Sequence, residues 1–333
     1  MNIATFTSKK FLVPGLLILV LIVLATLPLY GSRFLGMSSR DLYLAGIVLM
    51  YSALGVSWAM FSGSTGYLSL GTAAFFGVGI YTAALTRGIL PLGVIIAVAA
   101  LASFLIALLV GLVTLRLKGI FFAIFTFGLV MLIGQVVRYY EIVLQGRRGI
   151  SVVPTGYNNF YFLMLGLAVV TLLAIYFIRR SRLGLAMQSI GGNEEAAAHM
   201  GINTTMVKVT TFAISATFMG AVGAVYATRM IYVDPGLIFH MSNSFTPVLM
   251  AIFGGVGHLF GPVIGATVFT LLENWLSQIV PYYYPIIFGV ILIIVILYLP
   301  GGLVGLIPNL RNRLGEAVAK LRKGGQGEQS ANT

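Results

Sequence analysis

Two of the eight acidic residues in this chain stand side by side in a polar segment, residues 193–201, that lies between apolar stretches. The segment reads Asn-Glu-Glu-Ala-Ala-Ala-His-Met-Gly. Asn193 suits the N-cap of a helix, and Glu194 and Glu195 would fill the first turn, where the helix dipole favours acids. Gly201 can end the helix in the left-handed conformation. The pattern predicts a short, rigid helix that presents small side chains to a partner protein; an ordinary capped surface helix is the alternative.

The residues needed for catalysis or metal binding are missing from the sequence. There is no cysteine, which excludes thiol redox chemistry, disulfides and cysteine-based metal sites. His199, His240 and His258 are dispersed and have no metal-ligand spacing. No G-x-x-x-x-G-K-[ST] phosphate loop and no clustered nucleophile and base are present. We therefore expect neither enzyme activity, nor a metal site, nor a cofactor bound by this chain.

The composition is that of an integral membrane protein. Of the 333 residues, 59% are hydrophobic and 8% charged, and the mean hydropathy is +1.01. A soluble domain would carry roughly 25% charged residues. The 40 glycines fit closely packed transmembrane helices. The net charge of +12 comes from Lys and Arg in loops between spans, so that nucleic acid is not an expected partner.

The apolar stretches predict an all-α, polytopic bundle of about ten (8–10) transmembrane helices with glycine-broken or re-entrant segments. Residues 243–257 are short for a span and would cross only if tilted, or re-enter. The N-terminal stretch is interpreted as a retained span, because no A-x-A cleavage site follows it. The stretches long enough to cross a bilayer are residues 11–30, 42–61, 66–86, 92–115, 119–138, 160–178, 208–230, 261–280 and 283–299.

Charge distribution predicts the orientation. With ten crossings and the N-terminus inside, 13 of the Lys and Arg residues fall inside and 7 outside, in agreement with the positive-inside rule. Both termini are then cytoplasmic. The transmembrane domain covers residues 1–307, with a cytoplasmic loop at 179–207 and an external loop at 139–159 that is either a docking surface or simply solvated. Residues 308–333 form a basic amphipathic tail suited to anionic lipids.

Glycines break the helical pattern at two matching places, residues 63–71 and 254–265. Irregular backbone at membrane depth is tolerated where it lines a cavity, so the paired breaks indicate a substrate path; ordinary small-residue packing is the alternative. Glu273 is the one acid clearly within a predicted span, and pairing with a neighbouring helix is favoured over lining the path. The candidate path residues are Gly66, Tyr67, Ser69, Gly71, Thr72, Thr126, Gln135, Gly257, Gly261 and Glu273.

Four motifs, in the same order, resemble the permease subunits of branched-chain amino acid ABC importers, the LivH/LivM type. RSRLGLAMQSIGGNEEAAAHMGIN (180–203) is similar to their cytoplasmic EAA-x-x-x-G loop. GYLSLGTAAFFGVGIYTAAL (66–85), LRLKGIFFAIFTFG (115–128) and MAIFGGVGHLFGPVIGA (250–266) are similar to three membrane segments. The resemblance covers most of residues 40–305, and the 115–128 motif favours the LivM-like member.

The resemblance implies ATP-driven uptake across the bacterial inner membrane. The implied partners are a second, LivH-like permease, two cytoplasmic ATPase subunits that hold ATP and Mg, and an external solute-binding protein. Another small cargo, such as urea, an amide or a sugar, is the alternative. An ion-coupled transporter is disfavoured, because it would need several intramembrane acids or a proton relay. The residues implied to couple to the ATPase are Arg182, Gly184, Asn193, Glu194, Glu195, Ala196, Ala197 and Gly201.

Overall fold

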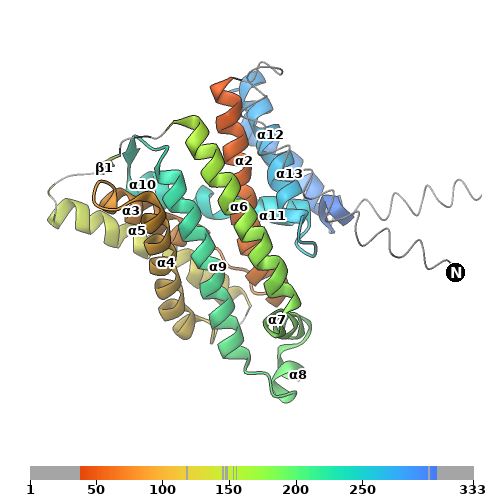
Figure 1. Ribbon diagram of the computed structural model, residues 1–333. Helices are drawn as coiled ribbons and strands as arrows, with labels where there is room; N and C mark the ends of the chain where they lie inside the picture. Colours follow the sequence, from red (N-terminus) through yellow and green to blue (C-terminus); the bar gives the residue numbers. More distant parts are fainter. Residues whose placement is uncertain are drawn as a thin grey trace, which may run out of the picture.

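The computed structural model describes residues 38–305, apart from 118, 145, 147, 148, 153, 155, 299 and 300. These residues form an all-helical bundle with one small two-stranded sheet (Figure 1). The expected first span, 11–30, and the expected basic tail, 308–333, lie outside the described residues.

Helices account for nearly all of the regular structure. Two of them, α2 and α5, continue into a turn of π-helix, η1 and η2. The elements are α2 (Ser39–Trp58), η1 (Ala59–Gly63), α3 (Thr72–Thr86), α4 (Leu92–Thr114), α5 (Ile120–Tyr139), η2 (Tyr140–Leu144), β1 (Ile150–Ser151), α6 (Tyr157–Arg180), α7 (Arg182–Gly192), α8 (Glu194–His199), α9 (Thr204–Ala227), β2 (Tyr232–Val233), α10 (Pro235–Ile238), α11 (Met241–Gly254), α12 (Gly261–Ile279) and α13 (Tyr284–Tyr298).

The expectation of a polytopic helical membrane protein is confirmed. Within the described residues, six helical segments are long and apolar enough to cross a bilayer. They are Ser39–Gly63, Leu92–Thr114, Ile120–Val143, Tyr157–Arg180, Thr204–Ala227 and Pro235–Gly254. The short stretch 243–257 becomes helix α11, which ends at Gly254. A total of ten crossings remains a prediction.

Two expected boundaries are wrong. The span predicted from residue 66 begins as helix α3 only at Thr72, because residues 66–71 have irregular backbone, with Gly66 at φ +75°. The loop predicted from residue 139 begins later, because α5 continues through η2 to Leu144. Glu141 of η2 is buried, and it accepts hydrogen bonds from the Tyr81 hydroxyl (3.1 Å) and the Gly149 amide (3.0 Å).

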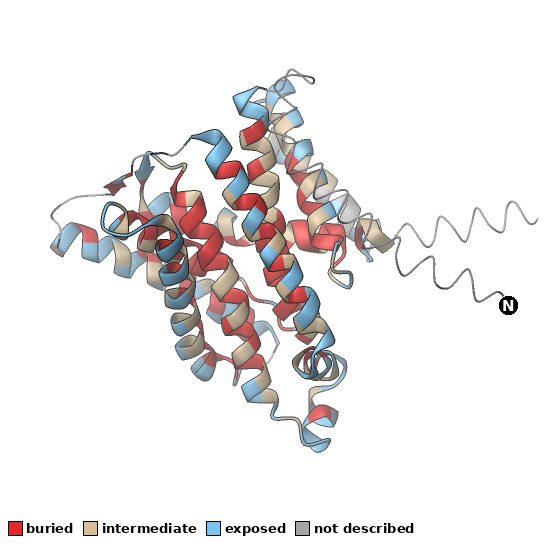
Figure 2. Cartoon of the chain, in the orientation of Figure 1, coloured by how far each residue is buried: buried red, intermediate tan, exposed pale blue. Residues whose placement is uncertain are grey.

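Helices α2, α3 and α9 form the buried centre, and α4, α5 and α6 expose apolar faces. Helix α9 packs along both α3 and α4, and α2 packs against α6 and α12. Buried residues run along the central helices in Figure 2, whereas the outer helices alternate between buried and exposed. Leu109, Leu132 and Phe177 are among the large side chains on these outer faces. Exposed apolar faces around a buried centre are what a lipid environment requires.

Candidate functional site

The segment 193–201 has the predicted local structure. The Asn193 side chain accepts from the Ala196 amide at 3.0 Å and caps helix α8. Gly201, at φ +84°, ends the helix, and its amide donates to the Ala198 carbonyl. Of the three alanines, Ala197 is buried against the protein and Ala196 and Ala198 are exposed. The helix therefore offers a small-residue face to solvent, as the sequence predicts.

Glu194, in the first turn of α8, is the hub of a polar network. Its carboxylate lies 2.7 Å from the Nζ of Lys208 and accepts a hydrogen bond from the Tyr67 hydroxyl. Lys208 also donates to the Tyr67 oxygen (3.1 Å) and to the Leu115 carbonyl (3.2 Å). The network joins α8 to the start of α9, to the irregular segment before α3 and to the end of α4.

Because Lys208 is buried, the network is a strong connection between these helices. Lys208 is only 2% exposed, and a buried ammonium requires a charge partner and satisfied hydrogen bonds. Its Nζ also lies 4.5 Å from the centroid of the Tyr67 ring, a cation–π contact. Burial, and then the neighbouring Glu194, raise the pKa of the Tyr67 hydroxyl, which therefore stays protonated and donates a hydrogen bond to the carboxylate.

The first glycine break is held by side-chain hydrogen bonds. The indole of Trp58 donates to the Ser69 carbonyl at 2.7 Å, and the Ser69 amide donates to the Ser62 hydroxyl at 3.2 Å. The Leu70 amide donates to the hydroxyl of buried Thr126 on α5 at 2.9 Å. Polar side chains from α2, η1 and α5 thus satisfy backbone groups that a continuous helix would satisfy itself.

The second glycine break is held by close backbone packing. A Cβ at Gly254 would collide with the carbonyl of Gly261, one at Gly261 with the carbonyl of Gly255, and one at Gly265 with the carbonyl of Met250. Three of its glycines are therefore explained by the packing of α11 on α12, which is the structural alternative stated above. Gly257 differs, because a Cβ there would meet no atom within 4 Å.

The two breaks lie against each other and against the ends of α6 and α7, and a Cβ at Gly63 of the first break would collide with the Val256 side chain of the second. A Cβ at Gly191, near the end of α7, would collide with the Ser64 carbonyl of the first break. Arg179, at the end of α6, donates to the Val256 carbonyl of the second break at 3.5 Å. A cavity of about 430 Å³ lies between these elements. It is lined by Gly63, Ser64, Gly66, Arg179, Gln188, Gly191, Val256 and Gly257.

The remaining candidate residues scatter. Thr72 is buried at the start of α3, beside Gly71. Gln135 lies on the exposed face of α5, away from both breaks. Glu273 is half-buried on α12, near enough to Tyr51 of α2 for its charge to act on that hydroxyl.

Among the expected coupling residues, Arg182 and Glu195 are exposed, and Gly184 is buried against the backbone of Arg179 where the chain turns from α6 into α7. Helix α7 itself was not expected.

Three charged residues of the structure are absent from the expected site. Lys208 and Glu141 are buried in helical segments. Glu141 lies within the membrane-spanning segment Ile120–Val143, so the expectation that Glu273 is the one acid within a span is wrong. Arg179 reaches the cavity between the breaks. The one sequence signal for Lys208 is its place at the very start of an apolar run, 14 residues after Glu194. Sequence spacing gives no pairing between them, because residues 200–203 turn the chain between α8 and α9.

Comparison with known proteins identifies the family. Residues 42–296 match the family described as branched-chain amino acid transport system / permease component. The chain is 27% identical to the high-affinity branched-chain amino acid transport system permease protein LivM of Salmonella typhimurium, over 93% of this chain and 82% of the relative. It is also 27% identical to the LivM protein of Escherichia coli K12, over 86% of this chain and 73% of the relative.

Sugar permeases match over a shorter region. The ribose import permease protein RbsC of Escherichia coli K12 is 27% identical over 39% of this chain and 43% of its own length. No solved structure matches the chain. The family match spans most of the bundle described above, including both glycine breaks and helices α7 and α8. The chain therefore belongs to the branched-chain amino acid transport system permease family.

Proposed function

We propose that this chain is the membrane-spanning subunit of an ABC importer that carries branched-chain amino acids into the cell. The observation that carries the proposal is the Glu194 network, in which the EAA helix α8 is tied by an ion pair and hydrogen bonds to the broken segment at residues 66–71. Relatives that cover most of the chain are named as branched-chain amino acid permeases, which supports this cargo.

Energy would reach the path through α8. An ATPase subunit that moves α8 would pull directly on Tyr67 through Glu194 and on α9 through Lys208. Because Lys208 is buried, its ion pair is protected from water and is not screened like a surface pair. Helix α7 would move with α8 and carry Gly191 against the first break. ATP and Mg would be held by the partner subunits.

The α7–α8 end also offers a docking surface for such a partner. Leu185, Met200 and Met206 are more than 60% exposed at this end. Large apolar side chains gathered at a polar end of a membrane protein are typical of a protein contact. We assign this end to the cytoplasm, with both termini on the same side, in the bacterial inner membrane. A second, LivH-like permease, two ATPase subunits and an external solute-binding protein complete the proposed importer, and anionic lipids would contact the tail at 308–333.

The experiment that tests the function is uptake by the whole transporter in proteoliposomes, with the chain, its second permease, both ATPases and the binding protein. We expect leucine uptake that requires ATP and that excess ribose or urea does not inhibit. The double variant Glu195→Arg, Gly201→Arg should insert into the membrane but take up nothing, because it changes the charge on the exposed face of α8 and strains the left-handed turn that ends the helix. Uptake without ATP, or full uptake by the double variant, would contradict the proposal. Uptake of ribose in place of leucine would favour a sugar as the cargo.

Orientation has its own test. The chain has no cysteine, so Asn193→Cys introduces a single thiol into it. In sealed right-side-out vesicles this thiol should react only with a membrane-permeant maleimide. Reaction with an impermeant maleimide would place α8 outside and reverse the topology.

A further inference from the structure

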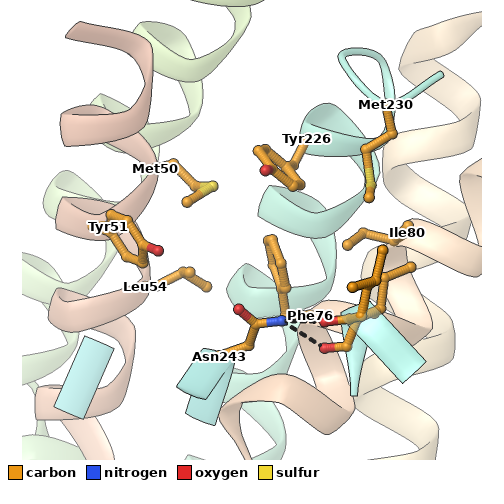
Figure 3. Close-up of a pocket in the computed structure, with 10 residues that line it drawn as sticks. Met50, Tyr51, Leu54, Phe76, Ile80, Tyr226, Met230 and Asn243 are labelled. Carbon is orange, nitrogen blue, oxygen red and sulfur yellow. Dashed lines mark hydrogen bonds between the residues drawn. The ribbon is translucent and has the colours of Figure 1, made fainter. Parts of the chain in front are cut away.

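A second cavity lies deeper in the bundle, between α2, α3, α9 and the α10–α11 turn (Figure 3). It has a volume of about 180 Å³. Its walls include Met50 and Leu54 of α2, Ile80 of α3, and Met230, which follows α9 and belongs to no helix. The cavity is separate from the one at α7, with which it shares no lining residue.

The walls suit an aliphatic group. Met50, Leu54 and Ile80 line the cavity, are buried and have side chains of carbon and sulfur only. None of the ten lining residues is charged. The ammonium and carboxylate of a bound amino acid compensate each other, whereas a charged side chain in addition would lose its hydration without gaining a charge partner among these residues. An apolar cavity of about 150 Å³ is known to accept benzene. The volume is therefore sufficient for the four-carbon side chain of leucine or isoleucine.

Neutral polar groups stand around the same space. Figure 3 shows the hydroxyls of Tyr51 and Tyr226 facing the gap between α2 and α9. The Nδ2 of Asn243 donates to the carbonyls of Leu237 and Ile238, both at 2.9 Å. Its side-chain oxygen therefore remains to accept a further hydrogen bond. The Tyr51 hydroxyl can donate to the carboxylate of an amino acid, and the Asn243 oxygen can accept from its ammonium, whereas the Tyr226 hydroxyl already has Tyr43 as a polar partner.

Two of the helices that line the cavity, α2 and α9, also lead to the Glu194 network. Lys208 lies near the start of α9 and Tyr226 near its end, 18 residues and roughly 27 Å apart at 1.5 Å per residue. Leu54 lies on α2, and the same helix leads through η1 into the first break, where Tyr67 contacts Glu194. A movement at α8 would thus reach the cavity walls along two continuous elements.

From these observations we infer that the cavity between α2, α3 and α9 is a binding station for the cargo on its way through this subunit, and that its walls select neutral amino acids with branched aliphatic side chains. The inference rests on the proposed function and adds to it the place where the side chain of the transported amino acid is recognised. Met50, Leu54, Ile80 and Met230 set the size of the space, and Tyr51 and Asn243 hold the charged backbone groups.

Changes in cavity size test the selection in the complete transporter. Met230→Trp narrows the cavity from a residue outside any helix, and Ile80→Ala enlarges it. One methylene in an apolar pocket changes discrimination by about 10–200-fold. We therefore expect Met230→Trp to lower the ratio of leucine to valine uptake about tenfold, and Ile80→Ala to raise phenylalanine uptake relative to leucine. Met131→Trp and Ile124→Ala make the same changes on the exposed face of α5 and should alter neither ratio.

A second measurement does not require a bulky substitution. Met230→Cys gives the chain a single thiol at the cavity, since the natural sequence has none. Leucine should slow its reaction with a methanethiosulfonate reagent, and lysine and ribose should not. If the Met230→Trp transporter fails to assemble, the protection of Met230→Cys by leucine decides whether the cavity binds the cargo.

The outcomes separate the two proposals. A wild-type transporter that takes up no amino acid overturns the proposed function, and the cargo of the cavity with it. A wild-type transporter that takes up leucine, with unchanged ratios in both cavity variants or no protection by leucine at Met230→Cys, overturns the cavity alone.

Discussion

The two glycine-rich breaks look alike in the sequence and are built differently. The first, at residues 63–71, is held by hydrogen bonds from Trp58, Ser62 and Thr126 to its backbone, and it is tied to α8 through Tyr67. The second, at residues 254–265, is held by backbone packed directly on backbone. Hydrogen bonds can be exchanged for others during a movement, whereas close packing has no alternative arrangement of similar energy. The comparison predicts that the first break can rearrange at a lower energetic cost than the second.

The largest effect is expected at the second break. Gly261→Ala would drive a methyl group into the Gly255 carbonyl, and the α11–α12 contact would have to open. We expect a loss of at least about 3 kcal/mol in the free energy of unfolding, as for severe overpacking. Gly257→Ala, in the same turn, meets no atom within 4 Å and should change it by less than about 0.5 kcal/mol. Thermal unfolding in detergent measures both, and equal midpoints would show that the second break is not close-packed.

The next largest effect is expected at the ion pair, where substitution of Glu194 and substitution of Lys208 should destabilise the protein to different extents. The Lys208 side chain is 3% exposed and that of Glu194 21%. Glu194→Gln leaves a buried ammonium unpaired, whereas Lys208→Met leaves a carboxylate that reaches water. We expect Glu194→Gln to cost about 2–3 kcal/mol of stability, less than for a fully buried pair, and Lys208→Met to cost less. Both should reduce leucine uptake more than ATP hydrolysis, because α8 is disconnected from the first break.

A double variant completes that test. If the two residues interact directly, the combined loss of stability should fall short of the sum of the single losses by about 1 kcal/mol or more. Simple addition of the two losses would mean that the pair does not connect α8 to the bundle.

A smaller effect is expected where α7 meets the first break. Gly191→Ala would push α7 away from the Ser64 carbonyl, whereas Gly192→Ala meets nothing within 4 Å. A local penalty of about 1–2 kcal/mol shifts a two-state equilibrium by about 5–30-fold. We expect Gly191→Ala to increase the ATP hydrolysed per leucine transported and Gly192→Ala to leave it unchanged. If the ATP hydrolysed per leucine transported is the same in both variants, α7 takes no part in the coupling.

An effect of similar size is expected inside the first break. Thr126→Val removes the acceptor of the Leu70 amide while keeping the shape of the side chain. The cost should be about 1–2 kcal/mol, that of one buried unsatisfied donor. Thr217→Val is the control, because that hydroxyl bonds only to Ala213 of its own helix. A Thr126→Val variant as stable as this control would show that the break does not depend on its side-chain hydrogen bonds.

Local patterns could be predicted because they depend on neighbouring residues. Asn193 and Gly201 determine where α8 begins and ends through their own side chain and backbone, and both predictions are confirmed. The start of α3 was predicted six residues early. Tyr67, Leu68 and Leu70 continue the hydrophobic pattern. Gly66 in the left-handed region and the hydrogen bonds with Trp58 and Thr126 nevertheless hold that stretch out of the helix.

Glycines were the least informative residues on their own. Gly254 and Gly257 stand three positions apart in one motif, yet the first is a packing contact and the second faces an open cavity. Which of them tolerates a side chain depends on where α12 lies, and this is not encoded in the two residues between them.

The sequence by itself determined the membrane environment, the helical bundle, the capped helix α8 and the family resemblance, because each follows from composition or from residues close together in the chain. Only the tertiary structure decided that Glu194 pairs with Lys208 and Tyr67, that the two breaks lie against each other beside the ends of α6 and α7, and that a cavity without charged lining residues lies between α2, α3 and α9. Tyr67 and Glu194 are 127 positions apart. Their contact depends on how α3, α8 and α9 pack, and no local periodicity carries that information.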